Sequence, residues 1–256
     1  MSVTPPPASI ARAGGRVVLW DEAIATRSPL FWPIAGAFEE LAAETARDGS
    51  AFPQPETIDA ALGARAGVRF ERQRPVSRRR RARRDPASMY DARIAREGCV
   101  PTRPGSWHDL MNALVWATFP RAKRALHARQ HELVVPAAPG ESARRTPELD
   151  ALALLDEGGL VVVREGAVVS AVPSEVELAT EIEEGRATAL VFGHAIYEGI
   201  VLGRSAPLAS VVTVTGPLAG VDGALELVIA DRSRLVDPSV MLRLRADEKL
   251  APRRAS

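Results

Sequence analysis

The hydrophobic pattern of this chain changes near Leu149, and that change constrains the fold more than any other feature. Before it, apolar residues recur at the three- to four-residue spacing of amphipathic helices. After it, short apolar runs rich in β-branched residues are typical of strands and alternate with helical segments. This order predicts an α+β fold in which a helical N-terminal half packs on a small mixed β-sheet with flanking helices, in a single domain.

We divide the 256 residues into three parts. Residues 1–28, punctuated by Pro and Gly, are predicted to form an extended arm. Residues 29–232 form the α+β domain, which includes an Arg-rich loop at 72–87. Residues 233–256 are predicted to be a C-terminal tail. A chain of this length buries a substantial core, so one domain with irregular ends is sufficient.

Periodicity and punctuation residues predict the individual elements. Thr57 is expected to cap one helix, and Ser174 with Glu177 matches a capping box at the start of another. The predicted helices cover residues 34–47, 54–67, 88–98, 107–119, 120–134, 174–185, 194–203 and 221–236. The predicted strands cover residues 68–73, 149–157, 159–165, 187–193 and 208–216.

The overall composition excludes several classes of protein. The 33 basic and 32 acidic side chains give a net charge of +1, so nothing global favours nucleic acid or anionic membranes. Cys99 is the only cysteine, which excludes an internal disulfide and a Cys-rich zinc site. No apolar run reaches the roughly 18–20 residues that span a membrane, and the N-terminus lacks the order of a signal peptide. We therefore expect a cytoplasmic protein without membrane association.

One segment departs from this balance, with eight arginines between Arg72 and Arg84. Such a run can form a patch that binds nucleic acid or phosphate. Alternatively, it is a solvated insertion. We favour the insertion, because no aromatic residues lie between the arginines to stack on bases.

The first cluster of polar side chains gathers on the predicted helix 107–119 and just after it. Its members are His108, Asp109, Asn112 and Lys123. His108 and Asn112 are four residues apart and share a helix face, and Asn112 is the only asparagine of the chain. Alternatively, Ser106 and Asp109 cap the helix, while His108 and Asn112 fix a connector by hydrogen bonds.

The second cluster pairs His194 with Glu198. Gly193 allows a tight turn between a strand and a helix, which places His194 at the helix N-terminus. The two side chains are four residues apart, so both can reach one metal ion or one proton. Alternatively, a partly buried histidine bonds to the glutamate of its own helix. His127 and His131 are also four residues apart, but flanking Arg and Gln indicate an exposed face, and we leave them out of the site.

The third cluster consists of Asp150, Asp156 and Glu157. We expect Asp150 to open the strand 149–157 and the other two to close it before a Gly-Gly pair. An acidic pair at a strand end suits a metal ligand or a general base. It is equally a common signal for a turn.

The order and spacing of these motifs resemble a bacterial family of uncharacterised proteins, the domain of unknown function 3025. The similarity extends over roughly residues 30–230. It implies no known activity, but it implies that the three clusters form one shared signature. The matching positions are Gly98, Pro101, Arg103, Trp107, His108, Asp109, Asn112, Ala113, Trp116, Phe119, Pro120, Lys123, Asp150, Ala151, Asp156, Glu157, Gly159, Gly193, His194 and Glu198.

Our leading hypothesis is a metal-assisted hydrolase, of the nuclease or phosphoesterase type, that acts on a small-molecule or anionic substrate. A divalent ion such as Mg²⁺, Mn²⁺ or Zn²⁺ would suit carboxylate and imidazole ligands. One alternative is a non-enzymatic binding or scaffold protein with a buried hydrogen-bond network. Another is nucleic-acid binding through the Arg-rich loop. The candidate residues are His108, Asp109, Asn112, His194 and Glu198 for catalysis, Arg103, Lys123 and Trp107 for substrate binding, and Asp150 and Glu157 for metal binding.

Overall fold

The computed structural model describes residues 12–13, 16–73, 90–134, 146–166 and 173–252. The α-helices in this part of the chain are α1 (Ala35–Asp48), α2 (Pro55–Ala66), α4 (Tyr90–Glu97), α5 (Trp107–Thr118), α6 (Pro120–Val134), α7 (Pro147–Gly158), α8 (Glu175–Glu183), α9 (His194–Val201) and α10 (Val221–Ala230). The strands are β1 (Arg12–Ala13), β2 (Arg16–Val17), β3 (Arg69–Arg72), β4 (Cys99–Thr102), β5 (Gly159–Arg164), β6 (Ala187–Val191), β7 (Leu208–Thr215) and β8 (Leu242–Arg245). Short 3₁₀ helices are η1 (Glu22–Thr26), η2 (Pro29–Ile34), η4 (Leu218–Gly220), η5 (Pro238–Val240) and η6 (Glu248–Leu250).

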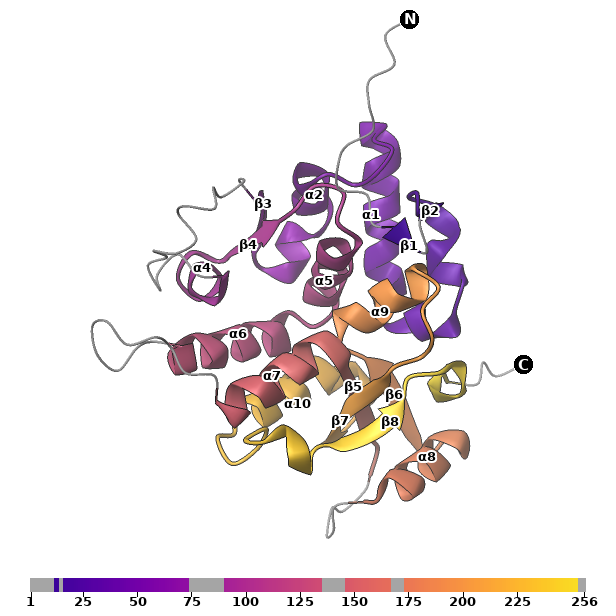
Figure 1. The fold of residues 1–256 in the computed structure, drawn as a ribbon, viewed down its shortest axis with the longest axis vertical. Coiled ribbons are helices and arrows are strands. Elements are labelled where there is room, and N and C mark those ends of the chain that lie inside the picture. The colour runs from indigo at the N-terminus through magenta and orange to yellow at the C-terminus, as the bar shows by residue number, and fades with distance from the viewer. Residues whose placement is uncertain (1–11, 14–15, 74–89, 135–145, 167–172, 253–256) are drawn as a thin grey trace, which may run out of the picture.

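The N-terminal half is mostly helical and is organised around α5 (Figure 1). Nine of the twelve residues of α5 are buried, because the helix contacts α1, α2, α6 and α9 on several sides. Such a helix is apolar nearly all round, as its sequence is. Ser106 caps it by accepting a hydrogen bond from the Asp109 backbone N–H at 3.2 Å, which confirms the predicted cap.

The second half contains a four-stranded sheet in the order β6-β5-β7-β8. The β5–β6 and β7–β8 pairs are antiparallel, whereas β5 and β7 are parallel, so the sheet is mixed. Strand β5 is central and almost wholly buried, as its continuous apolar run predicts. The predicted α+β class, with a helical first part and a small mixed sheet, is confirmed.

The segment 149–157 is a correction to the predicted strands, because it lies inside helix α7. Thr146 caps this helix by accepting from the Leu149 backbone N–H, and Pro147 occupies its first turn. Leu152 and Leu155 are buried one turn apart, which is helical rather than alternating spacing. The apolar run is short enough to fit either a strand or a helix, and the N-cap at Thr146 favours the helix.

Two smaller expectations also differ from the structure. Helix α2 begins after Gln54, so Thr57 is not its cap; the Thr57 hydroxyl instead donates to Asp48 at 2.7 Å. The connector after Gly98 contains strand β4, which pairs in parallel with β3. That pairing joins segments about 30 residues apart, and local sequence signals do not report it.

The ends of the chain contribute more to the fold than the predicted division implies. Ile24, in the predicted arm, is fully buried in the core. Strand β8, in the predicted tail, forms the edge of the main sheet beside β7. Of the predicted Arg-rich loop, Arg72 is described and pairs with Glu56 at 2.7 Å, whereas residues 74–87 lie outside the described residues. The nucleic-acid hypothesis that rests on that loop stays a prediction. In the described part of the chain, no helix is both long and apolar enough to cross a membrane.

Arg129 on α6 connects the two halves and carries our first testable prediction. Its buried guanidinium donates to Glu148 and to the backbone carbonyls of Ile229, Asp231 and Arg234, at 2.7–3.1 Å. Replacing Arg129 with methionine leaves these acceptors unpaired, so we expect the free energy of unfolding to fall by roughly 3–5 kcal/mol in urea titrations.

The control for this prediction is Arg124→Met on the same helix. The Arg124 side chain makes one exposed hydrogen bond, 3.3 Å long, to the Gly67 carbonyl. We expect its loss to change stability by less than about 1 kcal/mol. Equal destabilisation by the two substitutions would contradict the role assigned to Arg129.

Candidate metal centre

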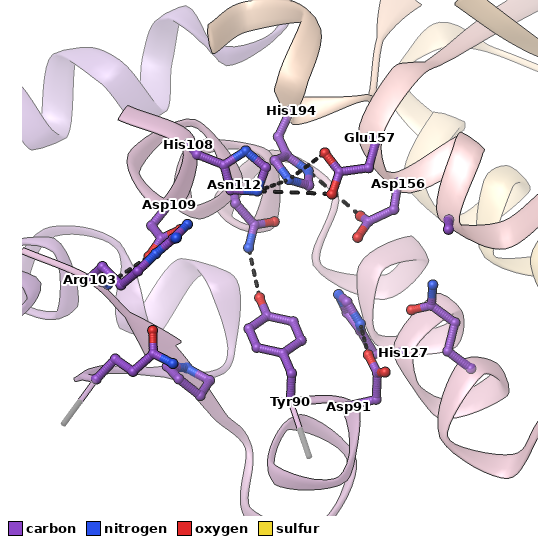
Figure 2. A pocket seen from close by; sticks show the side chains of 14 residues that line it. Tyr90, Asp91, Arg103, His108, Asp109, Asn112, His127, Asp156, Glu157 and His194 are labelled. Atoms are coloured by element: carbon purple, nitrogen blue, oxygen red, sulfur yellow. Dashed lines mark hydrogen bonds and ion pairs between the residues drawn. The ribbon is translucent and has the colours of Figure 1, made fainter. Parts of the chain in front are cut away.

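Members of all three sequence clusters line one cavity of about 370 Å³ that is enclosed mainly by helices (Figure 2). Its walls come from α4, α5, α6 and α7 and from the first residue of α9. Almost every lining side chain carries a polar group, so the cavity suits a polar ligand. The lining residues are Gln73, Tyr90, Asp91, Pro101, Arg103, His108, Asp109, Asn112, His127, Gln130, Ala153, Asp156, Glu157 and His194.

Two imidazoles and one carboxylate converge at this cavity. The Nε2 atoms of His108 and His194 are 3.0 Å apart. Glu157 places one carboxylate oxygen 3.4 Å from His194 Nε2 and the other 3.9 Å from His108 Nε2. Two nitrogens that each lie about 2.0–2.1 Å from one tetrahedral zinc ion are themselves roughly 3.3 Å apart. His108, Glu157 and His194 are therefore spaced so that they can hold one metal ion.

The pairing of β5 with β6 places Glu157 close to His194. Leu160 on β5 is the register partner of Val191 on β6. Helix α7 ends just before β5 and helix α9 begins just after β6, so the paired strands bring Glu157 and His194 close together, with His194 Nε2 3.4 Å from a Glu157 carboxylate oxygen. The two chain segments touch there, since a Cβ on Gly193 would lie 2.4–2.6 Å from backbone atoms of residues 157–159. Only glycine at 193 permits this approach.

His108 is oriented by Glu198. Its Nδ1 lies 3.4 Å from a carboxylate oxygen of Glu198, which comes from the next turn of α9 beyond His194. A carboxylate only accepts, so Nδ1 carries the proton and Nε2 faces His194. This hydrogen bond raises the pKa of His108 and lowers the pKa of Glu198. Such a carboxylate behind a ligating histidine is the usual support of metal sites.

His194 is held in its uncharged form. It is only 2% exposed, and this burial lowers its pKa to about 3. Its Nδ1 is 3.8 Å from the Asp156 carboxylate and has no hydrogen-bond partner among the described residues. Glu157 next to it is half exposed, and partial burial raises the pKa of its carboxyl group. The triad thus has one buried ligand and one ligand that is open to solvent.

A buried ammonium lies beside the triad. Lys123, which is 0% exposed, contacts Asp156 and donates to Asn112 Oδ1 at 2.7 Å. Burial is the largest influence on Asp156 and opposes its ionisation, but the charge and hydrogen bond of Lys123, together with the neighbouring histidines, outweigh burial and hold the pKa of this carboxyl well below its usual range. Asn112 in turn donates from Nδ2 to the Tyr90 hydroxyl at 2.8 Å. Lys123 was predicted to bind substrate, but it does not line the cavity; its two polar partners do.

Asp109 and Arg103 form a second pair at the cavity. The Arg103 guanidinium donates to both carboxylate oxygens of Asp109, at 2.9 and 2.6 Å, and the Arg103 backbone N–H donates at 2.6 Å. Both residues line the cavity, and the Arg103 side chain is more than half exposed. The fork geometry fixes the loop before α5, so Asp109 supports the wall of the cavity.

Two of the candidate residues lie away from the triad. Trp107 is fully buried; its indole N–H donates to the Val18 carbonyl, and its ring stacks on Trp20. Asp150 lies in the first turn of α7, about 10 Å along the helix axis from Glu157. Neither lines the cavity. Seven residues of the predicted strand would have spanned about 23 Å, so the helix shortens the distance between Asp150 and Glu157 but still leaves Asp150 two turns away.

Sequence reasoning missed His127, which was expected on an exposed face. His127 is 1% exposed, lines the cavity, and places Nδ1 2.9 Å from the Asp91 carboxylate. Its ring stacks on Trp116, with centroids 5.4 Å apart. The arginines near His127 in the sequence indicated an exposed position. The residue that it pairs with, Asp91, lies 36 residues earlier in the chain, so the local sequence contained no sign of this buried contact. Asp156, by contrast, was noted in the sequence and lies at the centre of the charged cluster.

Together, the fold and this site define a class: an α+β protein in which α5, α7 and α9 bring two imidazoles and a carboxylate to the wall of a polar cavity. The model of a family described as "protein of unknown function (DUF3025)" matches residues 76–255. The chain belongs to this family, and the resemblance seen in its motifs is confirmed. No curated protein and no solved structure shows significant similarity to the chain.

Proposed function

We propose that this protein is a metal-dependent hydrolase whose ion is held by His108, Glu157 and His194. The convergence of the two Nε2 atoms and the Glu157 carboxylate, at 3.0–3.9 Å, carries the proposal. Three protein ligands leave at least one coordination position for water or substrate, which is the arrangement of catalytic rather than structural sites. Glu157 is half exposed and lines the cavity, so a ligand in the cavity would be able to reach an ion held there.

The chemistry follows from the donor set. Two imidazoles and one glutamate are the zinc ligands of several hydrolytic enzymes, and they also bind other first-row divalent ions. An ion bound there would lower the pKa of a bound water and polarise an oxygen of the substrate. Glu198 would keep His108 in the ligating orientation, because its carboxylate holds the proton on Nδ1.

A purely structural role for these residues explains less of the geometry. Lys123, Asp156 and Asn112 do form a buried network of the kind that fixes the joint between domain halves. A scaffold has no need to place two imidazole Nε2 atoms 3.0 Å apart beside a solvent-open carboxylate. It also has no need for a cavity at that point. These features support the hydrolase over the scaffold.

The test begins with metal analysis of the purified protein, followed by titration of the metal-free protein with Zn²⁺ and Mn²⁺. We expect about one ion per chain. The loaded protein is then assayed with p-nitrophenyl acetate, p-nitrophenyl phosphate and bis(p-nitrophenyl) phosphate, before and after chelation by EDTA.

We expect at least one of these esters to be hydrolysed in a reaction that EDTA stops and added metal restores. The control is Glu183→Gln, which removes an exposed carboxylate of α8 outside the cavity lining and leaves Glu157 in place. A protein that takes up no metal, and hydrolyses none of the esters, would refute the proposal.

A further inference from the structure

The hydrogen bonds between Lys123, Asn112 and Tyr90 have one permitted direction. An ammonium group only donates, so Asn112 must present its Oδ1 to Lys123, at 2.7 Å. The Asn112 amide therefore presents Nδ2 to Tyr90, and this nitrogen donates to the phenol oxygen at 2.8 Å. The Tyr90 hydroxyl proton cannot point back at a donor. It must point elsewhere.

The remaining direction is the cavity. Tyr90 lines it, and Figure 2 shows the hydroxyl end pointing inward from α4 toward Asn112. Tyr90 as a whole residue is 37% exposed, but its hydroxyl is enclosed, and this burial together with the charge of Asp156 raises the pKa of Tyr90 well above its usual value. Among the described residues, the hydroxyl makes no hydrogen bond other than the one it accepts from Asn112. Its proton is therefore available to a ligand.

We infer that Tyr90 is a catalytic residue that donates a hydrogen bond to the doubly bonded oxygen of an ester substrate. This inference rests on the proposed hydrolase function. Water addition to a carbonyl carbon or to phosphorus shifts negative charge onto that oxygen, and a fixed donor stabilises the charge as it develops. The proton stays on Tyr90 throughout. The buried Lys123 charge strengthens the donor through Asn112, because hydrogen bonds in a chain polarise one another.

This role accounts for residues that the metal triad does not use. Among the described residues, neither Lys123 nor Asn112 forms a hydrogen bond with the triad histidines, yet both are buried at the site. Asn112 is the only asparagine of the chain and Lys123 one of two lysines. In this arrangement they set the direction in which Tyr90 donates. They are positioning residues, and Tyr90 alone would touch the substrate.

The test compares Tyr90→Phe with Tyr197→Phe, the same change at the only other tyrosine. The Tyr197 hydroxyl donates to the Val191 carbonyl at 2.9 Å, and Tyr197 does not line the cavity. Metal binding is measured first in the parent and both variants. Affinity of the metal-loaded proteins for acetohydroxamate, which ligates metals through its oxygens, is then measured by calorimetry. Hydrolysis of the p-nitrophenyl carboxylate and phosphate esters follows.

We expect Tyr90→Phe to bind metal as the parent does, to bind acetohydroxamate about tenfold more weakly and to hydrolyse its ester about a hundredfold more slowly. Tyr197→Phe should change neither value, and the ester that the parent prefers shows whether the substrate is carbonyl or phosphoryl. Parent-like affinity and rate in metal-loaded Tyr90→Phe would overturn the inference alone. A parent that binds no metal would overturn the proposed function, and this inference with it.

Discussion

Replacing His194 with alanine is expected to abolish the stabilisation that metal gives to the folded protein. His194 supplies the one deeply buried nitrogen of the triad, and its loss leaves His108 and half-exposed Glu157 to hold the ion. We expect the affinity for Zn²⁺ to fall by at least about a hundredfold. At a metal concentration about a hundred times the parent Kd, the parent gains about 2.7 kcal/mol of stability, and the variant gains almost none. Thermal unfolding with and without Zn²⁺ measures both effects.

The matched control is His131→Ala, which removes an imidazole from α6 outside the cavity lining. It should retain the full metal-induced shift in Tm. The scaffold hypothesis makes the opposite prediction: the parent gains no stability from metal, and His194→Ala loses a few kcal/mol without it. Such a result would refute the proposed metal centre and support a purely structural hydrogen-bond network.

Replacing Lys123 with methionine is expected to destabilise the protein by roughly 3–5 kcal/mol. The substitution keeps most of the apolar packing on Trp116 and Phe192, over which the ammonium lies at 5.6 and 5.9 Å. It leaves Asp156 charged and enclosed without its counter-ion, which is the costly outcome for a buried pair. Urea unfolding at neutral pH gives the difference directly.

Two variants separate charge from packing in that experiment. Lys249→Met removes the only other lysine, which is exposed, and should change stability by less than about 1 kcal/mol. The double variant Lys123→Met with Asp156→Asn removes both charges and should recover part of the loss. Equal destabilisation in the single and double variants would show that the Lys123–Asp156 charge pair contributes nothing.

Much of the fold was predictable because its signals are local. Apolar spacing and caps identified α1, α5 and α8, including the capping box of Ser174 and Glu177. The β-branched runs identified β5, β6 and β7. Glycine, Ser and Thr act on the residues beside them, so their effects are visible in a short stretch of sequence.

The features that sequence reasoning missed depend on distant partners. His127 is buried because Asp91, on another helix, pairs with it. Residues of β8 form a strand because they pair with the edge of β7, a contact that the local sequence does not report. The candidate site was only half predictable for the same reason. The histidines and acids were identifiable by type, but only the folded chain leaves Asp150 outside the cavity and brings Glu198 to His108.

The register of β5 and β6 ties the chemistry of the site to the packing of the core. A slip of one residue between these strands would turn every side chain of one strand to the opposite face of the sheet. The same slip would shift the start of α9 relative to the end of α7 and so move His194 away from Glu157, to which it now lies at 3.4 Å. A misaligned chain would therefore lose both apolar burial in the core and the arrangement of the proposed metal ligands. A bound ion would act as a reporter of correct strand alignment.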